Sequence, residues 1–103
     1  MEFQVEHRDG RLWASGDMTI YFAAAMKQQL LAGMQAGGTD VLLDLSQVAE
    51  LDTSGLQMLL LAQRLAAAEG RRFTLTQPSA VVCEVLELCG LNDLQDNDGA
   101  RLS

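Results

Sequence analysis

The residues best suited to chemistry form one short run, Asp52-Thr53-Ser54-Gly55, where a polar turn gives way to an apolar segment. A carboxylate, two hydroxyls and a glycine meet there at the start of a predicted helix. Unpaired backbone N–H groups and the positive end of the helix dipole favour an added negative charge at such a place. Taken without any wider comparison, Thr53 and Ser54 are most simply turn and helix-cap residues.

The rest of the sequence offers little to a catalytic or metal site. His7 is the only histidine, so a Ser-His-Asp arrangement has a single candidate base. Cys83 and Cys89 lie six positions apart in a predicted helix, which places them on different faces. We expect both cysteines to be small apolar residues, buried or half-buried, and we predict no metal, no cofactor and no enzymatic activity.

One remote enzymatic alternative is a homodimeric aspartic protease, because Asp52-Thr53 occurs in a chain of only 103 residues. In such an enzyme two chains each supply one carboxylate, and the pair shares a proton. That fold needs glycine directly after Asp-Thr and many short strands around it. Here Ser54 follows Thr53 and a leucine-rich helix comes next, which disfavours the protease.

Local patterns predict the elements that position this run. The first part of the chain is predicted to form a hairpin and one helix: strands at 3–7 and 12–14 around Asp9-Gly10, a strand end at Ser15-Gly16-Asp17, and a helix at 20–35 between the cap Thr19 and the stop Gly37-Gly38.

The second part is predicted to alternate strand and helix: a central strand at 41–45, a loop at 46–51, a helix at 54–69 with a Ser54 and Gln57 capping box, a strand at 73–76, and a helix from Ser79 to Cys89. Gly70 and Gly90 are expected to end the two helices. Residues 92–103 are polar and acidic and are expected to be a tail or a short terminal element.

The order β-β-α-β-α-β-α predicts an α/β fold with a small mixed sheet and helices packed against it. We expect residues 1–103 to form one domain, since a hydrophobic content of 49% suffices for one two-layer core. Seven basic residues face fourteen acidic ones, a net charge of −7, which argues against nucleic acid and anionic membranes as partners. The first residues lack a signal-peptide pattern and no apolar run could span a bilayer, so we expect a cytoplasmic protein.

The pattern of strand, loop, Asp52-Thr53-Ser54-Gly55-Leu56 and apolar helix resembles the STAS domain, a family named for sulfate transporters and anti-sigma factor antagonists. The segment AVVCEVLELCGL at 80–91 resembles the third helix of that family, and GDMTIY at 16–21 resembles the loop that enters its first helix. The resemblance covers almost the whole chain. It implies a bacterial regulatory protein that acts by binding other proteins.

The resemblance also implies roles for individual residues. Thr53 would be the phosphate acceptor, with Ser54 as the fallback, and Asp52 would orient the acceptor or the incoming kinase. Protein partners would contact Asp17, Thr19, Asp52, Ser54, Gly55 and Leu56. The sequence departs from the common pattern at Thr53, where serine is commonest, and at Thr19, where antagonists often carry aspartate.

The implied partner is a serine/threonine kinase, an anti-sigma-like regulator or a chemosensory signalling protein. The sequence of residues 16–21 resembles most the family members that accompany chemosensory proteins. The main alternative within the family is a constitutive adaptor that docks on a transporter ATPase without needing phosphorylation.

Overall fold

The computed structural model describes residues 1–35 and 38–91, and its elements follow the predicted order. In chain order they are β1 (Gln4–Arg8), β2 (Arg11–Met18), the 3-10 turn η1 (Ile20–Phe22), α1 (Ala23–Gln35), β3 (Asp40–Leu51), α2 (Thr53–Ala68), β4 (Arg72–Thr76) and α3 (Ala80–Leu88). The strands form one four-stranded mixed sheet, which confirms the predicted α/β fold. Within the described residues, no helix is long and apolar enough to cross a membrane.

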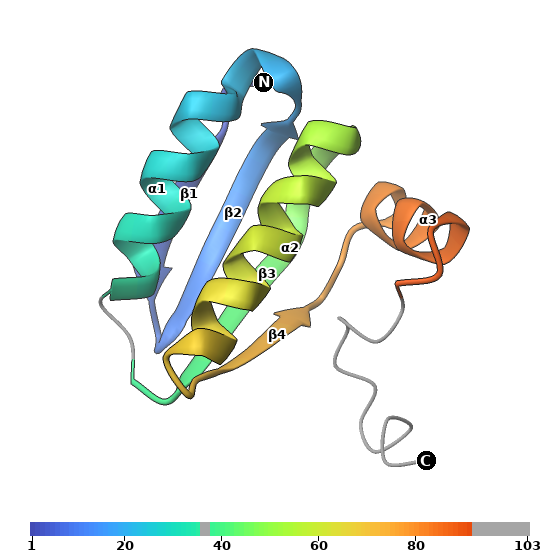
Figure 1. Cartoon of the computed structure of the whole chain (residues 1–103). Helices are drawn as coiled ribbons and strands as arrows, with labels where there is room; N and C mark the ends of the chain where they lie inside the picture. Colours follow the sequence, from blue (N-terminus) through green and yellow to red (C-terminus); the bar gives the residue numbers. More distant parts are fainter. Residues whose placement is uncertain (36–37, 92–103) are drawn as a thin grey trace.

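The sheet has the order β1-β2-β3-β4, with β1 and β2 antiparallel and the other two pairings parallel. Helices α1 and α2 lie side by side over one face of it (Figure 1). Between sheet and helices lies the core, in which the larger side chains with almost no exposure are Phe3, Met18, Met26, Leu30, Leu43, Leu45, Leu59, Leu75 and Leu86. Because β2 and β3 are parallel, their carboxyl ends meet at one edge of the sheet.

The predicted hairpin is present, and its turn has the expected chemistry. Asp9 and Gly10 both have positive φ angles, 54° and 72°, as a two-residue turn that matches the strand twist requires. The prediction that Ser15-Gly16-Asp17 ends the second strand is wrong, since β2 continues to Met18. Gly16, at φ 89°, lets the chain pass close to Glu2, whose carbonyl oxygen would lie 2.2 Å from a Cβ at that position.

β3 is the central strand, and it is much longer than its apolar first half. The predicted loop at 46–51 is wrong, because these residues continue the strand and pair with β2 through Ser15, Gly16 and Asp17. Only Val48 is buried in this half, and most of its other side chains are exposed. Because so few of its side chains are buried, this half of the strand has the polar sequence that is typical of a loop.

α3 takes the place that a longer β4 would occupy. β4 pairs only with the first half of β3, from Asp40 to Asp44, and the Ser79 N–H then donates to the Leu45 carbonyl at 3.2 Å. α3 contacts β3, and its buried side chains are Val82 and Leu86. The predicted Ser79 cap is confirmed, as its hydroxyl accepts from the Val82 N–H.

The structure also tests the predictions for the two cysteines and for the glycines at the helix ends. Cys83 is half-buried as expected, but Cys89 is exposed, since it caps the last turn of α3 where that helix leaves the core. The stops at Gly70 and Gly90 are supported by positive φ angles of 72° and 67°. Gly37 and the tail 92–103 lie outside the described residues, so the predictions made for them stay predictions.

Candidate functional site

The run Asp52 to Gly55 lies at the edge where the carboxyl ends of β2 and β3 meet. Chain segments leave both strands there: η1 begins at Ile20 after β2, and α2 begins at Thr53 after β3. Figure 1 shows η1 and the first turn of α2 at the same end of the molecule, with the arrowhead of β2 between them. In open α/β sheets, ligands usually bind outside the carboxyl ends of the strands.

Asp52 joins the two segments through both of its carboxylate oxygens. Oδ1 accepts from the Gly55 N–H at 3.0 Å, and Oδ2 accepts from the Ile20 N–H at 2.9 Å. The backbone N–H of Asp52 donates to the Met18 carbonyl at 3.1 Å. The end of β2, the start of η1 and the first turn of α2 are therefore held together by one residue.

Asp52, rather than Ser54, is the N-cap of α2, so the predicted capping box of Ser54 with Gln57 is wrong. The helix begins one residue earlier than predicted, and the Asp52 side chain accepts from the Gly55 N–H, whereas a Ser54 cap would have accepted from the Gln57 N–H. Thr19 was also expected to cap a helix. It stands at the N-cap of η1, but its side chain makes no capping hydrogen bond, and the Ile20 N–H is satisfied by Asp52 instead.

The surroundings of Asp52 keep its carboxylate ionised. Burial by itself raises the pKa of Asp52, but the hydrogen bonds from the backbone N–H groups of Gly55, Ile20 and Ser54 outweigh it, so the pKa lies below its ordinary value of 3.8. A fixed negative charge therefore stands directly before Thr53 at neutral pH.

Gly55 allows the helix to start against the sheet. A Cβ at this position would lie 2.2 Å from the Met18 carbonyl oxygen and 2.6 Å from a methyl group of Leu51. The absence of a side chain at Gly55 therefore allows the close approach of helix to strand. It brings the first turn of α2, and Thr53 with it, directly onto the ends of β2 and β3.

The other residues predicted for this site lie at the same edge. Thr53 is exposed as the first residue of α2, whereas Ser54 and Leu56 are half-buried, Leu56 against the core. Asp17 is half-buried at the end of β2, with its carboxylate 2.6 Å from the amino group of Met1. The fold thus brings Asp17, Thr19, Asp52 and the first turn of α2 together.

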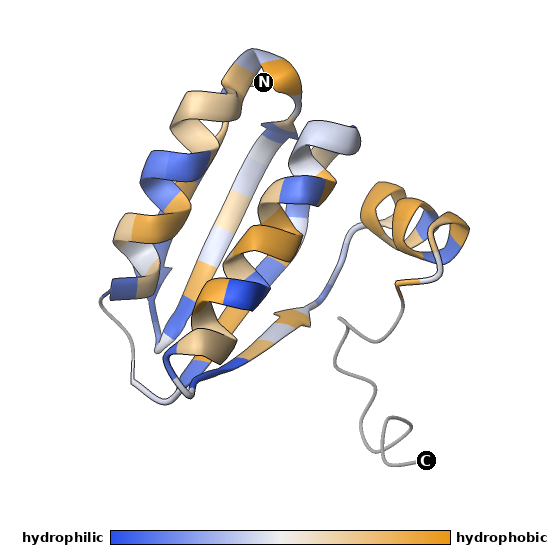
Figure 2. Ribbon diagram, viewed as in Figure 1, coloured by the Kyte–Doolittle hydropathy of each residue, from blue (hydrophilic) through white to orange (hydrophobic). Residues whose placement is uncertain are grey.

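The structure adds residues that sequence reasoning did not assign to the site. Ile20 and Tyr21 are exposed apolar side chains on η1, and Figure 2 shows hydrophobic colour at this turn. Glu50 from β3 and Val81 from α3 also line this edge. The available signal was the presence of two large apolar residues, Ile20 and Tyr21, at the predicted start of a helix.

In the described part of the chain, no group of three or more His, Cys, Asp or Glu side chains could hold a metal ion. Asp52, the residue on which the aspartic protease alternative depends, caps a helix. A mixed sheet of four strands with three α-helices is also unlike the β-rich fold that the protease needs.

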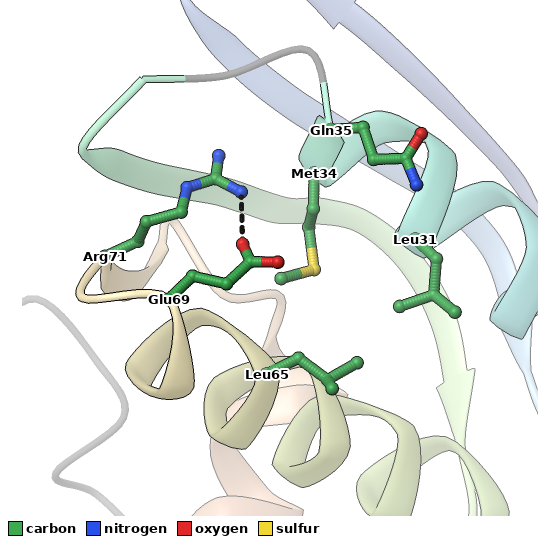
Figure 3. Close-up of a pocket in the computed structure, with 6 residues that line it drawn as sticks. All are labelled: Leu31, Met34, Gln35, Leu65, Glu69 and Arg71. Atoms are coloured by element: carbon green, nitrogen blue, oxygen red, sulfur yellow. Dashed lines mark hydrogen bonds and ion pairs between the residues drawn. The ribbon is translucent and has the colours of Figure 1, made fainter.

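A separate hollow of about 400 Å³ lies at the opposite edge, between the last turns of α1 and α2 (Figure 3). Its lining residues are Leu31, Met34, Gln35, Leu65, Glu69 and Arg71. Arg71 donates from Nε to the Gly38 carbonyl at 2.8 Å and from Nη1 to Glu69 at 3.2 Å, while its buried Nη2 has no partner among the described residues. No residue of the predicted site lies there.

Comparison with known proteins gives one family match and several similar folds. A family model described as "Mlab, STAS domain" matches residues 1–96. The anti-sigma factor antagonist SpoIIAA in its unphosphorylated form is similar with a TM-score of 0.70 at 20% identity, over 91% of this chain and 85% of that one. No curated protein sequence matches the chain closely enough to count as a relative.

Two further solved structures have the same fold. The phosphorylated form of SpoIIAA from Bacillus gives a TM-score of 0.65 at 19% identity, over 91% of this chain and 88% of that one. An anti-sigma factor antagonist from Mycobacterium paratuberculosis gives 0.73 at 23% identity, over 90% and 80%. At these identities the likeness concerns the fold.

Proposed function

The chain belongs to the STAS domain family, and from this we propose that it is a non-enzymatic regulatory module of bacterial signalling that binds a protein partner under the control of phosphorylation at Thr53. The observation that carries the proposal is the exposed hydroxyl of Thr53 at the first position of α2, beside the fixed carboxylate of Asp52. We further propose that the protein acts in the cytoplasm.

A kinase can reach the Thr53 hydroxyl without unfolding the domain, because the side chain is exposed and the helix cap is made by Asp52. A phosphate would add a charge of about −1.5 to −2 at this point. The helix N-terminus attracts that charge and the Asp52 carboxylate repels it. Since these effects oppose each other, phosphorylation should change the partner surface more than the fold.

The similar structures support this reading. SpoIIAA is known in an unphosphorylated and a phosphorylated form, and the present fold resembles both. For this chain we propose a serine/threonine kinase, an anti-sigma-like regulator or a chemosensory protein as partner. The contact surface would comprise Asp17, Thr19, Asp52, Ser54, Gly55 and Leu56.

A second candidate is a constitutive adaptor that docks on a transporter ATPase. It is favoured by Ile20 and Tyr21, which are 63% and 91% exposed on the same edge. Apolar side chains of this kind can bind a partner whether or not a phosphate is present. The two candidates therefore differ in whether Thr53 affects binding.

The test is to incubate the protein with ATP and cell lysate or a kinase encoded nearby and to map phosphate by mass spectrometry. We expect modification at Thr53, its loss in Thr53→Ala, and its persistence in the matched control Ser54→Ala. Modification of Ser54 alone would move the acceptor by one residue.

Binding is then compared between the unmodified protein, the phosphoprotein, Thr53→Ala and Thr53→Glu. We expect the phosphate to change affinity about tenfold to a hundredfold, equivalent to about 1–3 kcal/mol. Weaker binding would indicate an acidic or apolar partner surface, and tighter binding an arginine cluster. Absence of phosphate together with unchanged binding by both variants would exclude the switch and leave the adaptor.

A further inference from the structure

The edge of the sheet where β2 and β3 end beside Thr53, called here the Thr53 edge, continues into two adjoining hollows that reach from η1 to α3. The first, of about 660 Å³, lies between η1 and the ends of β2 and β3, and the second, of about 210 Å³, lies between the end of β3 and α3. Both are lined by Thr19, Glu50 and Asp52, so they form one continuous surface. We call this surface the η1–α3 groove.

The groove has apolar side chains that contribute little to the core. Ile20 and Tyr21 line its first part, and Val81, 37% exposed, lines its second part with Val85. Tyr21 is 91% exposed, so it stands on the surface rather than inside a cavity. Exposed apolar side chains beside open hollows suit the side chains of another protein better than an enclosed small molecule.

The charged side chains that line the groove all carry carboxylates: Asp17, Glu50, Asp52 and Glu84. Glu50 and Glu84 are exposed, and neither forms an ion pair with another described residue. In the part of the chain that the structure describes, no lysine or arginine side chain lines either hollow. The side chains of the groove therefore combine exposed apolar groups with negative charges.

The arginines that form ion pairs or ring contacts lie elsewhere. Arg8 and Arg11 stack on Trp13, with 4.4 Å and 5.5 Å from each guanidinium carbon to the ring centre. Arg71 and Arg72 stand at the start of β4, away from the groove. Among the described residues that line the groove, the positive charge is the amino group of Met1, and it is paired with the Asp17 carboxylate at 2.6 Å.

We propose that the partner enters the η1–α3 groove with a protein segment that has apolar side chains in its centre and arginine or lysine at its flanks. The apolar side chains would pack on Ile20, Tyr21 and Val81, and the cations would face Glu50 and Glu84. This rests on the proposed function in taking the Thr53 edge as a protein-binding surface. With a partner segment that carries arginine or lysine, a phosphate on Thr53 would tighten binding.

The experiment uses a photo-crosslinking residue, p-benzoylphenylalanine, placed in the full chain and expressed in the source cells. It replaces Tyr21 in the groove, Gln57 on the exposed side of the first α2 turns, or Arg64 farther along α2 as background. Crosslinked peptides are then sequenced by mass spectrometry. From position 21 we expect a protein segment with apolar residues flanked by arginine or lysine.

Glu84→Lys and Glu87→Lys provide the matched charge test, because both are exposed on α3 and only Glu84 lines the groove. Glu84→Lys should lower the crosslinking yield from position 21 roughly tenfold at low salt, and less at high salt. Glu87→Lys should leave the yield unchanged.

The outcomes separate the groove from the wider function. A crosslinked segment rich in acidic residues, or equal yields for the two lysine variants, would overturn the groove proposal. Crosslinks from position 57 and none from position 21 would overturn it while leaving a protein-binding function in place. Background yields at both positions would overturn both proposals.

Discussion

The carboxylate of Asp52 is the most consequential single group in the candidate site. It caps α2, holds the Ile20 N–H, and places a negative charge beside Thr53. The same residue therefore serves both the local fold and the electrostatics that a phosphate on Thr53 would meet. Asp52 contributes hydrogen bonds and a negative charge, and the contribution of the charge to the free energy of unfolding can be recognised because it depends on pH.

Replacing Asp52 by Asn keeps an acceptor for a helix N–H but removes the charge. At neutral pH we expect Asp52→Asn to lower the free energy of unfolding by up to about 1 kcal/mol. Because the folded pKa is depressed below 3.8, the contribution of the carboxylate is full above that pH and is lost as pH falls through the folded pKa. Urea unfolding followed by Trp13 fluorescence from pH 7 to about pH 2 measures it.

The expected signature is a difference in unfolding free energy between wild type and Asp52→Asn that shrinks below about pH 4. Glu87→Gln, which removes an exposed carboxylate from α3, serves as the control and should give a difference near zero throughout. A difference for Asp52→Asn that grows toward acid pH would contradict the assigned sign.

Gly55→Ala tests the close approach of helix and strand. Alanine is favoured over glycine in a helix interior by about 1 kcal/mol. Here its Cβ would lie 2.2 Å from the Met18 carbonyl oxygen, so the backbone would have to shift. We expect a net loss of about 1–3 kcal/mol, measured by thermal or urea unfolding. Gly38→Ala, with no atom within 4 Å of the added carbon, should be nearly neutral; a stabilised Gly55→Ala would refute the packing.

Among the elements, α3 packs against β3, whose second half does not pair with β4. Two leucines on it form a natural pair for a test. Leu86 is fully buried and Leu88 is 80% exposed. The contrast follows from the helical period, which turns one residue toward the sheet and the other toward solvent.

Leu86→Ala should lower the free energy of unfolding by about 2–5 kcal/mol, because it removes buried methyl groups and leaves a cavity. Leu88→Ala should change it by no more than about 0.5 kcal/mol. Chemical denaturation of both variants measures the two values. Similar losses in the two variants would mean that α3 does not pack on β3 as described.

At the level of the molecule, the balance of charge limits the classes of partner. The net charge of −7 is joined to a local arrangement in which carboxylates line the Thr53 edge. Phosphate backbones would be repelled by both. Proteins with basic segments would be attracted, and attraction of this kind weakens as salt screens it.

We therefore expect no detectable DNA binding at physiological salt. A gel-shift assay with a mixed double-stranded probe measures this, and lowering the salt should produce no more than weak binding. Tight binding that falls steeply with added salt would show a basic surface that the described residues lack, and would argue against the acidic groove as the main interaction surface.

Much of the fold was already determined by the sequence. Asp9-Gly10 has the turn chemistry of a hairpin, Gly70 and Gly90 have the positive φ angles of helix ends, and Ser79 caps α3. These features depend on residues close together in the chain, so local pattern suffices to predict them. The family motif at 52–56 was likewise readable without a structure.

Only the tertiary structure decided the rest, because it depends on contacts between residues distant in sequence. Residues 46–51 are a strand because β2 pairs with them, although their side chains read as a loop. Asp52 caps α2, rather than Ser54, because the same carboxylate also holds the Ile20 N–H, 32 positions away. Ile20 and Tyr21 are exposed because they lie on η1, which has no buried residue and precedes the buried face of α1.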